Sequence, residues 1–305
     1  MPLALDYRPS TLNKVAGNEG IKKSLSALLK RPTNDIPRCF AFFGNSGCGK
    51  TTIARIVASM LGCESTDFYE LNAASVRGID TIREIEKQIR FKPIHGKKRV
   101  WLLDEVHQYP TASQEALLKM FEECPEHVAF MICTTDPQKL KPALKGRCTT
   151  FEVKPLTDEE MGDFLYGVCE AEEVDVPEEV IEKIVEISNG APRNALQQLE
   201  KVIDLPKKEM LKSIQQIQET ETQVIELCRL LLKKGVKWGE VSKVISTIEA
   251  EPEQIRYAVL GYCNSVLLKS DNPRAFLIMG EFAEPTYNTG KAGVTMAAYA
   301  VVTGG

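Results

Sequence analysis

The stretch CFAFFGNSGCGKTT, residues 39–52, decides the fold of this chain of 305 residues. Its first five residues, Cys39–Phe43, are all apolar and predict a buried strand. Gly44–Thr51 follows with the spacing GxxxxGKT, and Lys50–Leu61 has the pattern of a helix. A glycine-rich turn between a strand and a helix points successive backbone N–H groups at phosphate oxygens, and the helix N-terminus adds partial positive charge. The stretch therefore predicts a phosphate-binding loop.

The complete motif, in its strand-and-helix context, favours a nucleotide site over a chance glycine turn. Lys50 is expected to reach the β- and γ-phosphates of ATP, and Thr51 is expected to bind Mg²⁺. The residues of this segment expected to line the site are Gly44, Asn45, Ser46, Gly47, Cys48, Gly49, Lys50, Thr51 and Thr52.

A second motif, VWLLDE at residues 100–105, ends in two carboxylates. Its apolar residues predict a buried strand, and ligands of open α/β sheets bind at the carboxyl ends of strands. Asp104 is therefore expected to hold Mg²⁺ through water, and Glu105 to polarise the attacking water. About fifty residues separate this pair from the phosphate-binding loop, which fits two adjacent strands.

Apolar runs alternate with helical periodicity between residues 38 and 153, which predicts a parallel sheet covered by helices. The expected strands are 39–43, 68–71, 100–103, 128–133 and 150–153, and the expected helices are 50–61, 79–89 and 113–123. After the fifth strand the pattern is helical only, beginning with a capping box at Thr157–Glu160. We therefore expect an α/β nucleotide-binding domain at 1–155 and helical domains at 156–205 and 206–305.

Three further polar residues have two interpretations each. Thr135 follows the fourth expected strand and could contact the γ-phosphate or the attacking water, or belong to an ordinary turn. Arg147 and Arg193 could be surface arginines or phosphate ligands. Arg193 stands in the first turn of an expected helix, where a cation opposes the helix dipole, and this favours a phosphate partner.

Composition and charge exclude several classes of protein. The 38 basic and 42 acidic residues argue against coating nucleic acid by bulk positive charge, although a local DNA-binding surface stays open. No apolar run approaches the ~20 residues of a membrane span. No secretory signal is visible, so we expect a cytoplasmic protein with no membrane partner. Nine cysteines without CxxC spacing favour free thiols over structural zinc.

Taken together and in this order, the motifs resemble clamp-loader ATPases of the AAA+ class. The closest likenesses are the gamma/tau subunit of bacterial DNA polymerase III and the small subunits of replication factor C, including phage counterparts. The likeness runs from Leu5 to about Leu199. It is carried also by YRPST at 7–11, VAGN at 15–18, LNAASVRGID at 71–80 and TTDPQKL at 134–140. It implies a AAA+ P-loop NTPase with a five-stranded parallel sheet, a small helical lid domain carrying sensor 2, and an all-helical collar domain.

The resemblance implies roles that the residues alone leave open. Thr135 matches the sensor-1 position, Arg193 matches sensor 2, and Arg147 matches an arginine that acts in trans on a neighbour's ATP. The implied catalytic set is Lys50, Asp104, Glu105, Thr135, Arg193 and, in trans, Arg147, and the implied adenine-side residues are Tyr7, Arg8 and Val15. The implied DNA contacts are Ser75, Arg77, Lys145 and Arg147, and the implied clamp contacts are Arg90 and Phe91. Arg77 is further implied to hold Glu105 away from water, and Gln114 to couple neighbouring subunits.

The implied function is that of an ATPase subunit of a sliding-clamp loader in DNA replication. Five subunits would form an open ring, in which ATP drives assembly, clamp opening and binding of primer–template DNA. Hydrolysis triggered by DNA would then release the clamp. The family's zinc module and long C-terminal extension are not seen, so we expect a compact subunit without structural zinc, in the host cytoplasm if phage-encoded.

Two alternatives stay open. The first is a AAA+ branch-migration helicase motor, which would normally end in a winged-helix domain of helices and a β-hairpin. The second is a scaffold subunit that binds nucleotide without hydrolysing it.

Overall fold

The computed structural model describes residues 2–73 and 78–304, with all their side chains except those of 215–221. The chain divides into two compact units, Met1–Met210 and Leu211–Gly305. The first unit holds the sheet and the helices packed around it. Short 3₁₀ turns in this unit are η1 (Leu12–Lys14), η2 (Thr33–Asp35), η3 (Ser65–Asp67) and η4 (Val106–Gln108).

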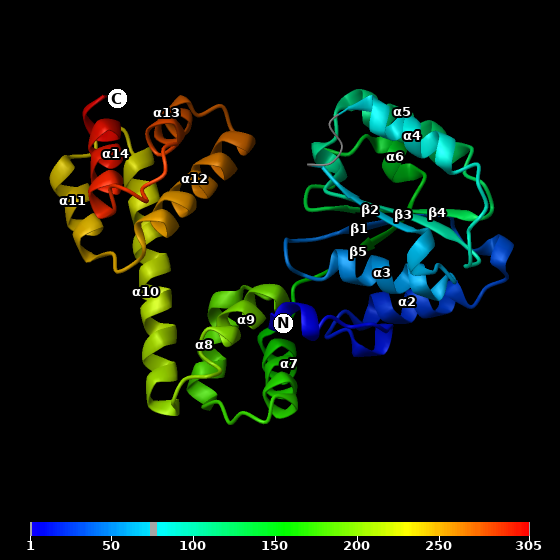
Figure 1. The fold of residues 1–305 in the computed structure, drawn as a ribbon, viewed down its shortest axis with the longest axis horizontal. Helices are drawn as coiled ribbons and strands as arrows, with labels where there is room; N and C mark the ends of the chain where they lie inside the picture. The colour runs from blue at the N-terminus through cyan, green and yellow to red at the C-terminus, as the bar shows by residue number, and fades with distance from the viewer. Residues whose placement is uncertain (1, 74–77, 305) are drawn as a thin grey trace. The chain divides into compact units, whose positions relative to one another are not determined.

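The sheet has five parallel strands in the order β2-β3-β4-β1-β5 (Figure 1). The strands are β1 (Cys39–Phe43), β2 (Phe68–Asn72), β3 (Arg99–Asp104), β4 (Val128–Thr134) and β5 (Thr149–Glu152). The predicted α/β fold with a five-stranded parallel sheet is confirmed. The expectation that the loop strand and the acidic strand are adjacent is wrong, because β4 lies between β1 and β3.

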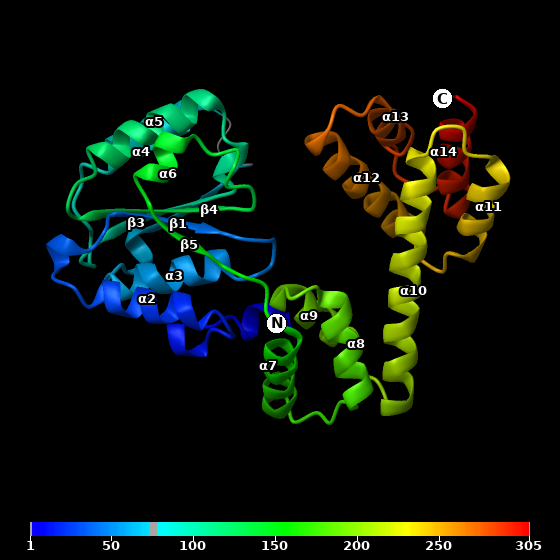
Figure 2. The same cartoon turned by 180° about the vertical axis from the view of Figure 1, so that it is seen from behind.

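Helices cover both faces of this sheet (Figures 1 and 2). One face carries α2 (Glu19–Leu29) and α3 (Lys50–Met60), and the other carries α4 (Ile79–Gln88), α5 (Thr111–Glu122) and α6 (Pro142–Gly146). Successive side chains of a strand point to opposite faces. In β1, Ala41 and Phe43 therefore enter the core beneath α4 and α5, whereas Phe40 and Phe42 enter the core beneath α3.

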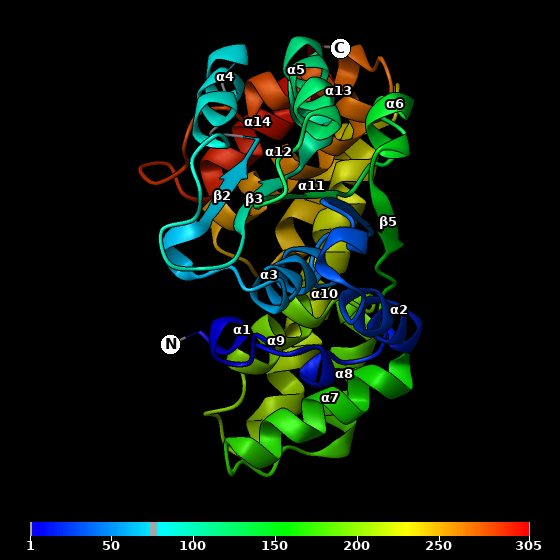
Figure 3. The same ribbon diagram turned by 90° about the vertical axis from the view of Figure 1, so that its right-hand side faces the viewer.

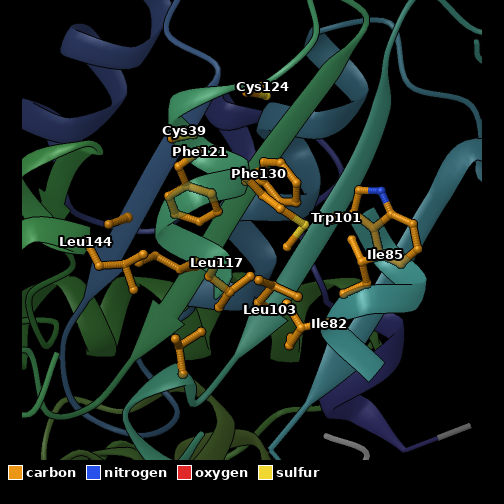
Figure 4. Packing of buried hydrophobic residues seen from close by; sticks show 14 of the residues in the cluster. Cys39, Ile82, Ile85, Trp101, Leu103, Leu117, Phe121, Cys124, Phe130 and Leu144 are labelled. Atoms are coloured by element: carbon orange, nitrogen blue, oxygen red, sulfur yellow. The ribbon is translucent and has the colours of Figure 1, made fainter. Parts of the chain in front are cut away.

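The core on the α4 and α5 side fixes those two helices to the sheet (Figure 4). Ile82 and Ile85 of α4 are 1% and 2% exposed, and Phe121 of α5 lies with its ring centroid 4.9 Å from that of Phe130 in β4. Burying a side chain of this size contributes about 1.5–3 kcal/mol. Ile82 and Ile85 of α4, and Ile89 at its C-cap, all belong to this core.

Three helices follow β5, namely α7 (Asp158–Ala171), α8 (Glu178–Ser188) and α9 (Pro192–Glu200). The predicted capping box opens α7: Thr157 Oγ1 accepts from the Glu160 N–H, and Glu160 Oε2 accepts from the Thr157 N–H. The short N-terminal helix α1 (Leu3–Asp6) lies against α9 (Figure 3). The N-terminal segment and the three helices thus stand beside the sheet within one unit.

A four-residue connector, residues 153–156, joins β5 to Thr157, the N-cap of α7, and is held by hydrogen bonds at three points. The Val153 N–H donates to the Phe43 carbonyl at 2.6 Å. The Asn18 side chain pairs with both backbone groups of Lys154, at 3.0 Å and 2.9 Å. The Leu156 N–H donates to the Gly190 carbonyl at 2.9 Å, just before α9. Neither end of the connector is free to move without breaking backbone bonds.

In the described residues of the second unit, helices are the only regular secondary structure. It contains most of α10 (Lys207–Leu232), with α11 (Trp238–Thr247), α12 (Pro252–Lys269), α13 (Pro273–Glu281) and α14 (Lys291–Thr303). Leu227, Val259, Ile278 and Val294 are fully buried in its shared core. Its large exposed apolar side chains are Ile225, Tyr257, Leu268, Phe276, Tyr287, Met296 and Tyr299.

Among the helices that the structure describes, none has both the length and the apolar character needed to cross a lipid bilayer. All nine cysteines are free thiols. No group of three or more potential metal-ligating side chains of the His, Cys, Asp or Glu type is found in the described residues.

Candidate active site

The loop 44–49 connects β1 to α3 and turns around two glycines that no other residue could replace without strain. Gly44 has φ 147°, and a Cβ atom there would lie 2.1 Å from the Val153 carbonyl oxygen. Gly47 has φ 78°, and its Cβ would lie 3.3 Å from that of Ala191, the N-cap of α9. The loop is therefore packed between the connector and the start of α9, and it leads into the N-terminus of α3, where backbone N–H groups can bind an anion.

Lys50, the first residue of α3, is only 5% exposed. Its ammonium group donates to the Gly44 carbonyl at 3.0 Å and to the Asn45 carbonyl at 2.9 Å. These bonds hold the cation over the loop, where it can neutralise a phosphate bound to the loop's N–H groups.

Thr51, in the first turn of α3, and Asp104, at the end of β3, meet although β1 and β3 are not neighbouring strands. The Thr51 hydroxyl donates to Asp104 Oδ2 at 2.9 Å, and the Glu105 N–H donates to Asp104 Oδ1 at 3.0 Å. A hydroxyl and a carboxylate oxygen are the hard ligands that Mg²⁺ prefers, and Mg²⁺ usually completes its shell with phosphate and water. The donor set at this point thus fits a magnesium ion.

Glu105 is held in one orientation by two hydrogen bonds from Thr135 and a close contact with His107. Its φ of 51° is in the left-handed region, which is uncommon for a residue with a side chain and is found often at functional sites. Its Oε2 accepts from the Thr135 N–H at 3.2 Å and from the Thr135 hydroxyl at 3.0 Å. The same oxygen lies 3.2 Å from Nδ1 of His107. The structure thereby joins Glu105 to Thr135, two residues that the sequence singled out separately.

Two cavities meet at the loop. The more polar one is lined by Ser46, Gly47, Gly49, Lys50, Thr51, Thr52, Asp104, Glu105 and Arg193. The other is lined by residues that include Tyr7, Arg8, Val15, Gly47, Cys48, Gly49, Thr52 and Arg193. Arg193, at the start of α9, lines both cavities. Gly44, Asn45 and Thr135 line neither cavity but contact residues that do.

The cavity that Tyr7 and Arg8 line also contains positive charge. Burial lowers the pKa of Arg8, and the nearby charges of Arg55 and Arg193 lower it further. Arginine remains charged despite such shifts, so Arg8 and Arg193, which line this cavity, can attract an anion. The hydrogen bond from Tyr7 to Glu172 raises the pKa of Tyr7 to about 12, which keeps its hydroxyl protonated. Burial likewise raises the pKa of Cys48, so this loop residue is a thiol.

Arg147 and Lys145 stand apart from this site, at the end of α6. Arg147 is exposed and pairs with Glu122 at the end of α5. Lys145 lies with its ammonium nitrogen 5.2 Å from the ring centroid of Phe43. Neither residue lines the two cavities at the phosphate-binding loop.

The remaining predicted residues have mixed outcomes. Ser75 and Arg77 lie outside the described residues. Arg90 and Phe91 follow α4 on the surface, where Phe91 is 65% exposed. Gln114 is 6% exposed, and its amide group bonds the Tyr109 carbonyl and the Lys141 N–H. Both ends of this side chain are thus bonded within the subunit, which gives no support to the expectation that Gln114 couples neighbouring subunits.

The loop after α4 is built on a buried ion pair that sequence reasoning missed. Asp67, fully buried, accepts from the N–H groups of Ile94 and His95 at 2.8–3.1 Å, and Gly96 N lies 3.5 Å from Oδ2. Arg99, 5% exposed, lies 3.4 Å from the same carboxylate. The only available signal was an arginine at the start of a predicted strand, where a buried cation needs a partner.

The structure resembles solved AAA+ proteins. The RuvB Holliday junction branch migration motor of Thermotoga maritima matches with a TM-score of 0.60 and 19% identity, over 79% of this chain and 85% of that one. A point mutant of the same protein matches with a TM-score of 0.62 and 18% identity, over 79% of this chain and 86% of that one. The fold and the phosphate-binding loop define a P-loop protein of the AAA+ class.

Sequence comparison narrows this class. Residues 67–157 match the family described as DNA polymerase III, delta subunit. DNA polymerase III subunit gamma of Buchnera aphidicola subsp. Baizongia pistaciae is 30% identical over 263 residues, which are 77% of this chain and 70% of that protein. Subunit gamma/tau of Mycobacterium tuberculosis is 33% identical over 226 residues, which are 67% of this chain. The chain belongs to the clamp-loader AAA+ family of DNA polymerase III gamma and tau subunits. It spans 39% of the length of the mycobacterial relatives it matches.

Proposed function

We propose that the chain is an ATP-hydrolysing subunit of a sliding-clamp loader that works in DNA replication. One observation carries this proposal: Lys50, Thr51, Asp104 and Glu105 gather at one edge of the sheet, whereas Arg147 lies outside both cavities there. A site with every cis group and a separate exposed arginine suits an ATPase whose sites are completed by neighbours.

In this proposal the nucleotide is ATP with Mg²⁺. Thr51 and Asp104 would hold the ion, the latter through water, and the bound ion would neutralise charge on the phosphates. Lys50 and the loop N–H groups bind the phosphates, and Arg193 binds from α9. Tyr7, Arg8 and Val15 flank the base. The cavity linings and the 2.9 Å Thr51–Asp104 contact support this arrangement.

Glu105 is proposed as the general base. It takes a proton from water as the water oxygen bonds to the γ-phosphorus, and the bond to the β–γ bridging oxygen breaks to leave ADP and phosphate. Thr135 holds Glu105 in the contact described above and orients it toward the water. General-base assistance of this kind contributes about 10²–10⁴-fold in rate.

Arg147 is proposed to complete the site of an adjacent subunit in a five-membered ring. Its pairing with Glu122 and its distance from its own nucleotide cavities support this role. In the assembled complex, Arg147→Ala should lower kcat by about 10³-fold, the lower range for arginine fingers. Arg83→Ala removes an arginine that is likewise exposed and paired, with Asp80, and should leave kcat unchanged. ATP hydrolysis at the parental rate by assembled Arg147→Ala subunits would refute the trans role.

DNA and clamp contacts complete the proposal. Lys145 and Arg147 form a local basic surface at α6 that can track a DNA backbone without sequence readout. The family resemblance also names Ser75 and Arg77 as DNA contacts, and Arg77 as the residue restraining Glu105, but both lie outside the described residues. Arg90 and Phe91 are proposed to meet the clamp, supported by the exposure of Phe91 on a loop fixed by Asp67.

We propose that residues 1–155 act as the nucleotide-binding domain, 156–205 as a lid and 206–305 as a collar that holds the ring together. Arg193 at the cavities supports the lid role. The helical second unit, with exposed aromatic side chains such as Phe276 and Tyr287, is compatible with the collar role.

The likeness to RuvB favours a branch-migration motor as the second candidate. The described residues of 211–304 form helices only, which supports the collar over a winged-helix domain with a β-hairpin. A scaffold subunit that only binds nucleotide is disfavoured because Lys50, Asp104, Glu105 and Arg147 are all retained. Measuring ATPase activity with primer–template DNA and a cognate sliding clamp separates the three. Clamp-dependent stimulation supports the loader, strand movement without a clamp supports the motor, and nucleotide binding without hydrolysis supports the scaffold.

A further inference from the structure

We infer that His107 is a positioning residue for Glu105, fixing which carboxylate oxygen faces the attacking water. The inference rests on the proposed ATPase function, in which Glu105 is the base. His107 lies in η4, two residues after Glu105, with its side chain 11% exposed. Its Nδ1 lies 3.2 Å from Glu105 Oε2 and 2.8 Å from Thr134 Oγ1.

The hydrogen on Nδ1 follows from the chemistry of its partners. An ionised carboxylate can only accept a hydrogen bond, so an Nδ1 that bonds Glu105 must carry a hydrogen. Thr134 Oγ1 already accepts the Asp136 N–H at 3.1 Å, and a hydroxyl oxygen has a second lone pair for Nδ1–H. We therefore place the hydrogen on Nδ1, where it bonds the Thr134 hydroxyl and faces the Glu105 carboxylate, whose Oε2 lies 3.2 Å from the nitrogen.

Thr134 makes this arrangement rigid. It is the last residue of β4, is fully buried, and pairs in register with Phe43 just before the phosphate-binding loop. A histidine bonded to such a fixed point cannot follow Glu105 if the carboxylate rotates. His107 thus fixes the orientation of the Glu105 carboxylate relative to the sheet.

The consequence concerns the two oxygens of Glu105. Oε2 accepts the Thr135 N–H and the Thr135 hydroxyl, and Nδ1 of His107 lies 3.2 Å from it, so protein groups surround this oxygen. Oε1 is left as the oxygen that accepts the proton from water. Without His107, Thr135 alone restrains the carboxylate, and rotation would exchange the two oxygens.

The test compares three substitutions of His107 in the full chain, assembled with its ring partners, clamp and primer–template DNA. His107→Leu removes both nitrogens. His107→Asn returns an N–H at the same distance along the side chain as Nδ1, and His107→Gln returns one where Nε2 stood. We expect His107→Leu to lower kcat about tenfold, short of the ~10²–10⁴ lost with the base itself. His107→Asn should recover most of that loss and His107→Gln little, with the KM for ATP unchanged in all three.

Thr134→Val supplies a second measurement, because it keeps the shape of the side chain and removes the fixed point of His107. We expect it to lower kcat, and the double variant with His107→Leu to be no slower than His107→Leu alone, since both act through one contact. Binding of a fluorescent ATP analogue and thermal melting show whether each variant folds and binds nucleotide.

The outcomes separate this inference from the proposed function. If Glu105→Gln hydrolyses ATP as fast as the parent, the assignment of the base fails. If Glu105→Gln is inactive while folded His107→Leu keeps the parental kcat, only the positioning role of His107 is overturned. The same holds if His107→Gln restores kcat as well as His107→Asn does.

Discussion

Replacing Asp67 with asparagine should destabilise the first unit far more than the same change at an exposed aspartate. Asp67 is fully buried and faces the guanidinium group of Arg99, which is itself 5% exposed. Asparagine keeps the shape but loses the charge, and one of its two acceptor oxygens becomes an N–H donor. The buried Arg99 is then left without its counter-ion, and one or more N–H groups of the loop lose their acceptor.

The expected loss follows from these contacts. Removing one partner of a buried ion pair typically costs about 3–5 kcal/mol, because a buried charge is left uncompensated. Asparagine still offers one carbonyl oxygen to the loop, so we expect the lower end, about 3 kcal/mol. With a urea m-value of ~2 kcal/mol/M, the unfolding midpoint should fall by roughly 1.5 M.

Tryptophan fluorescence during urea unfolding measures this loss. Trp101 reports on the first unit, since it is buried in β3 and stacks on Tyr69 at 4.4 Å between ring centroids. The other tryptophan, Trp238, lies in the second unit and is replaced by phenylalanine in every variant. Asp80→Asn is the matched control, because Asp80 also pairs with an arginine but is 87% exposed. It should cost no more than about 1 kcal/mol. Equal midpoint shifts for the two variants would refute the reasoning.

Three further predictions concern the pH dependence of Asp67, the backbone of Gly44 and the charge of Lys50. Burial alone would raise the pKa of Asp67, but its backbone N–H partners and Arg99 lower that pKa overall. The contribution of Asp67 to the free energy of unfolding is therefore complete above the unfolded pKa of about 3.9, and it is lost as the pH falls through the folded pKa. The midpoint gap between the parent and Asp67→Asn should accordingly shrink between pH 5 and about pH 2 in urea titrations, and a constant gap would contradict the assignment. Gly44→Ala should lower the melting temperature of the first unit because its Cβ would clash with the Val153 carbonyl, whereas Gly162→Ala, in an open helical position, should be neutral or stabilising by up to about 1 kcal/mol; calorimetry compares them. Lys50→Met should weaken binding of a fluorescent ATP analogue by at least about tenfold at unchanged melting temperature, and unchanged affinity would exclude Lys50 from the phosphate site.

The fold was predictable because its signals are local. The apolar run Cys39–Phe43, the glycines after it and the capping box at Thr157 each specify a short segment, and an alternating series of such segments defines an α/β sheet. The order of strands is not local. The pairing of β1 with β4 depends on how the crossover helices pack, and sequence distance gave the wrong neighbour for β3.

The candidate site was predictable where one motif contains all its groups, as for Lys50 and Thr51. The contacts of Glu105 were harder, because Thr135 reaches it across a gap of thirty residues. His107 stands two residues after Glu105 in the sequence, but without distances a histidine near two carboxylates has many possible roles. Gln114 shows a further difficulty, since a polar residue on a predicted helix is normally exposed, and here it is buried with both ends bonded.

The connector couples the position of α9 mechanically to the phosphate-binding loop. Val153 is tied to the strand that ends at the loop, Leu156 is tied to Gly190, and three residues later Arg193 returns to the nucleotide cavities. Four extended residues span at most about 14 Å. If α7–α9 rotate, either these four residues change conformation or the phosphate-binding loop moves as well. Binding and helix arrangement are thermodynamically linked. If nucleotide shifts the equilibrium toward one arrangement of these helices by a given factor, that arrangement binds nucleotide more tightly by the same factor. Substitutions at Asn18, which lines neither cavity, should therefore change nucleotide affinity.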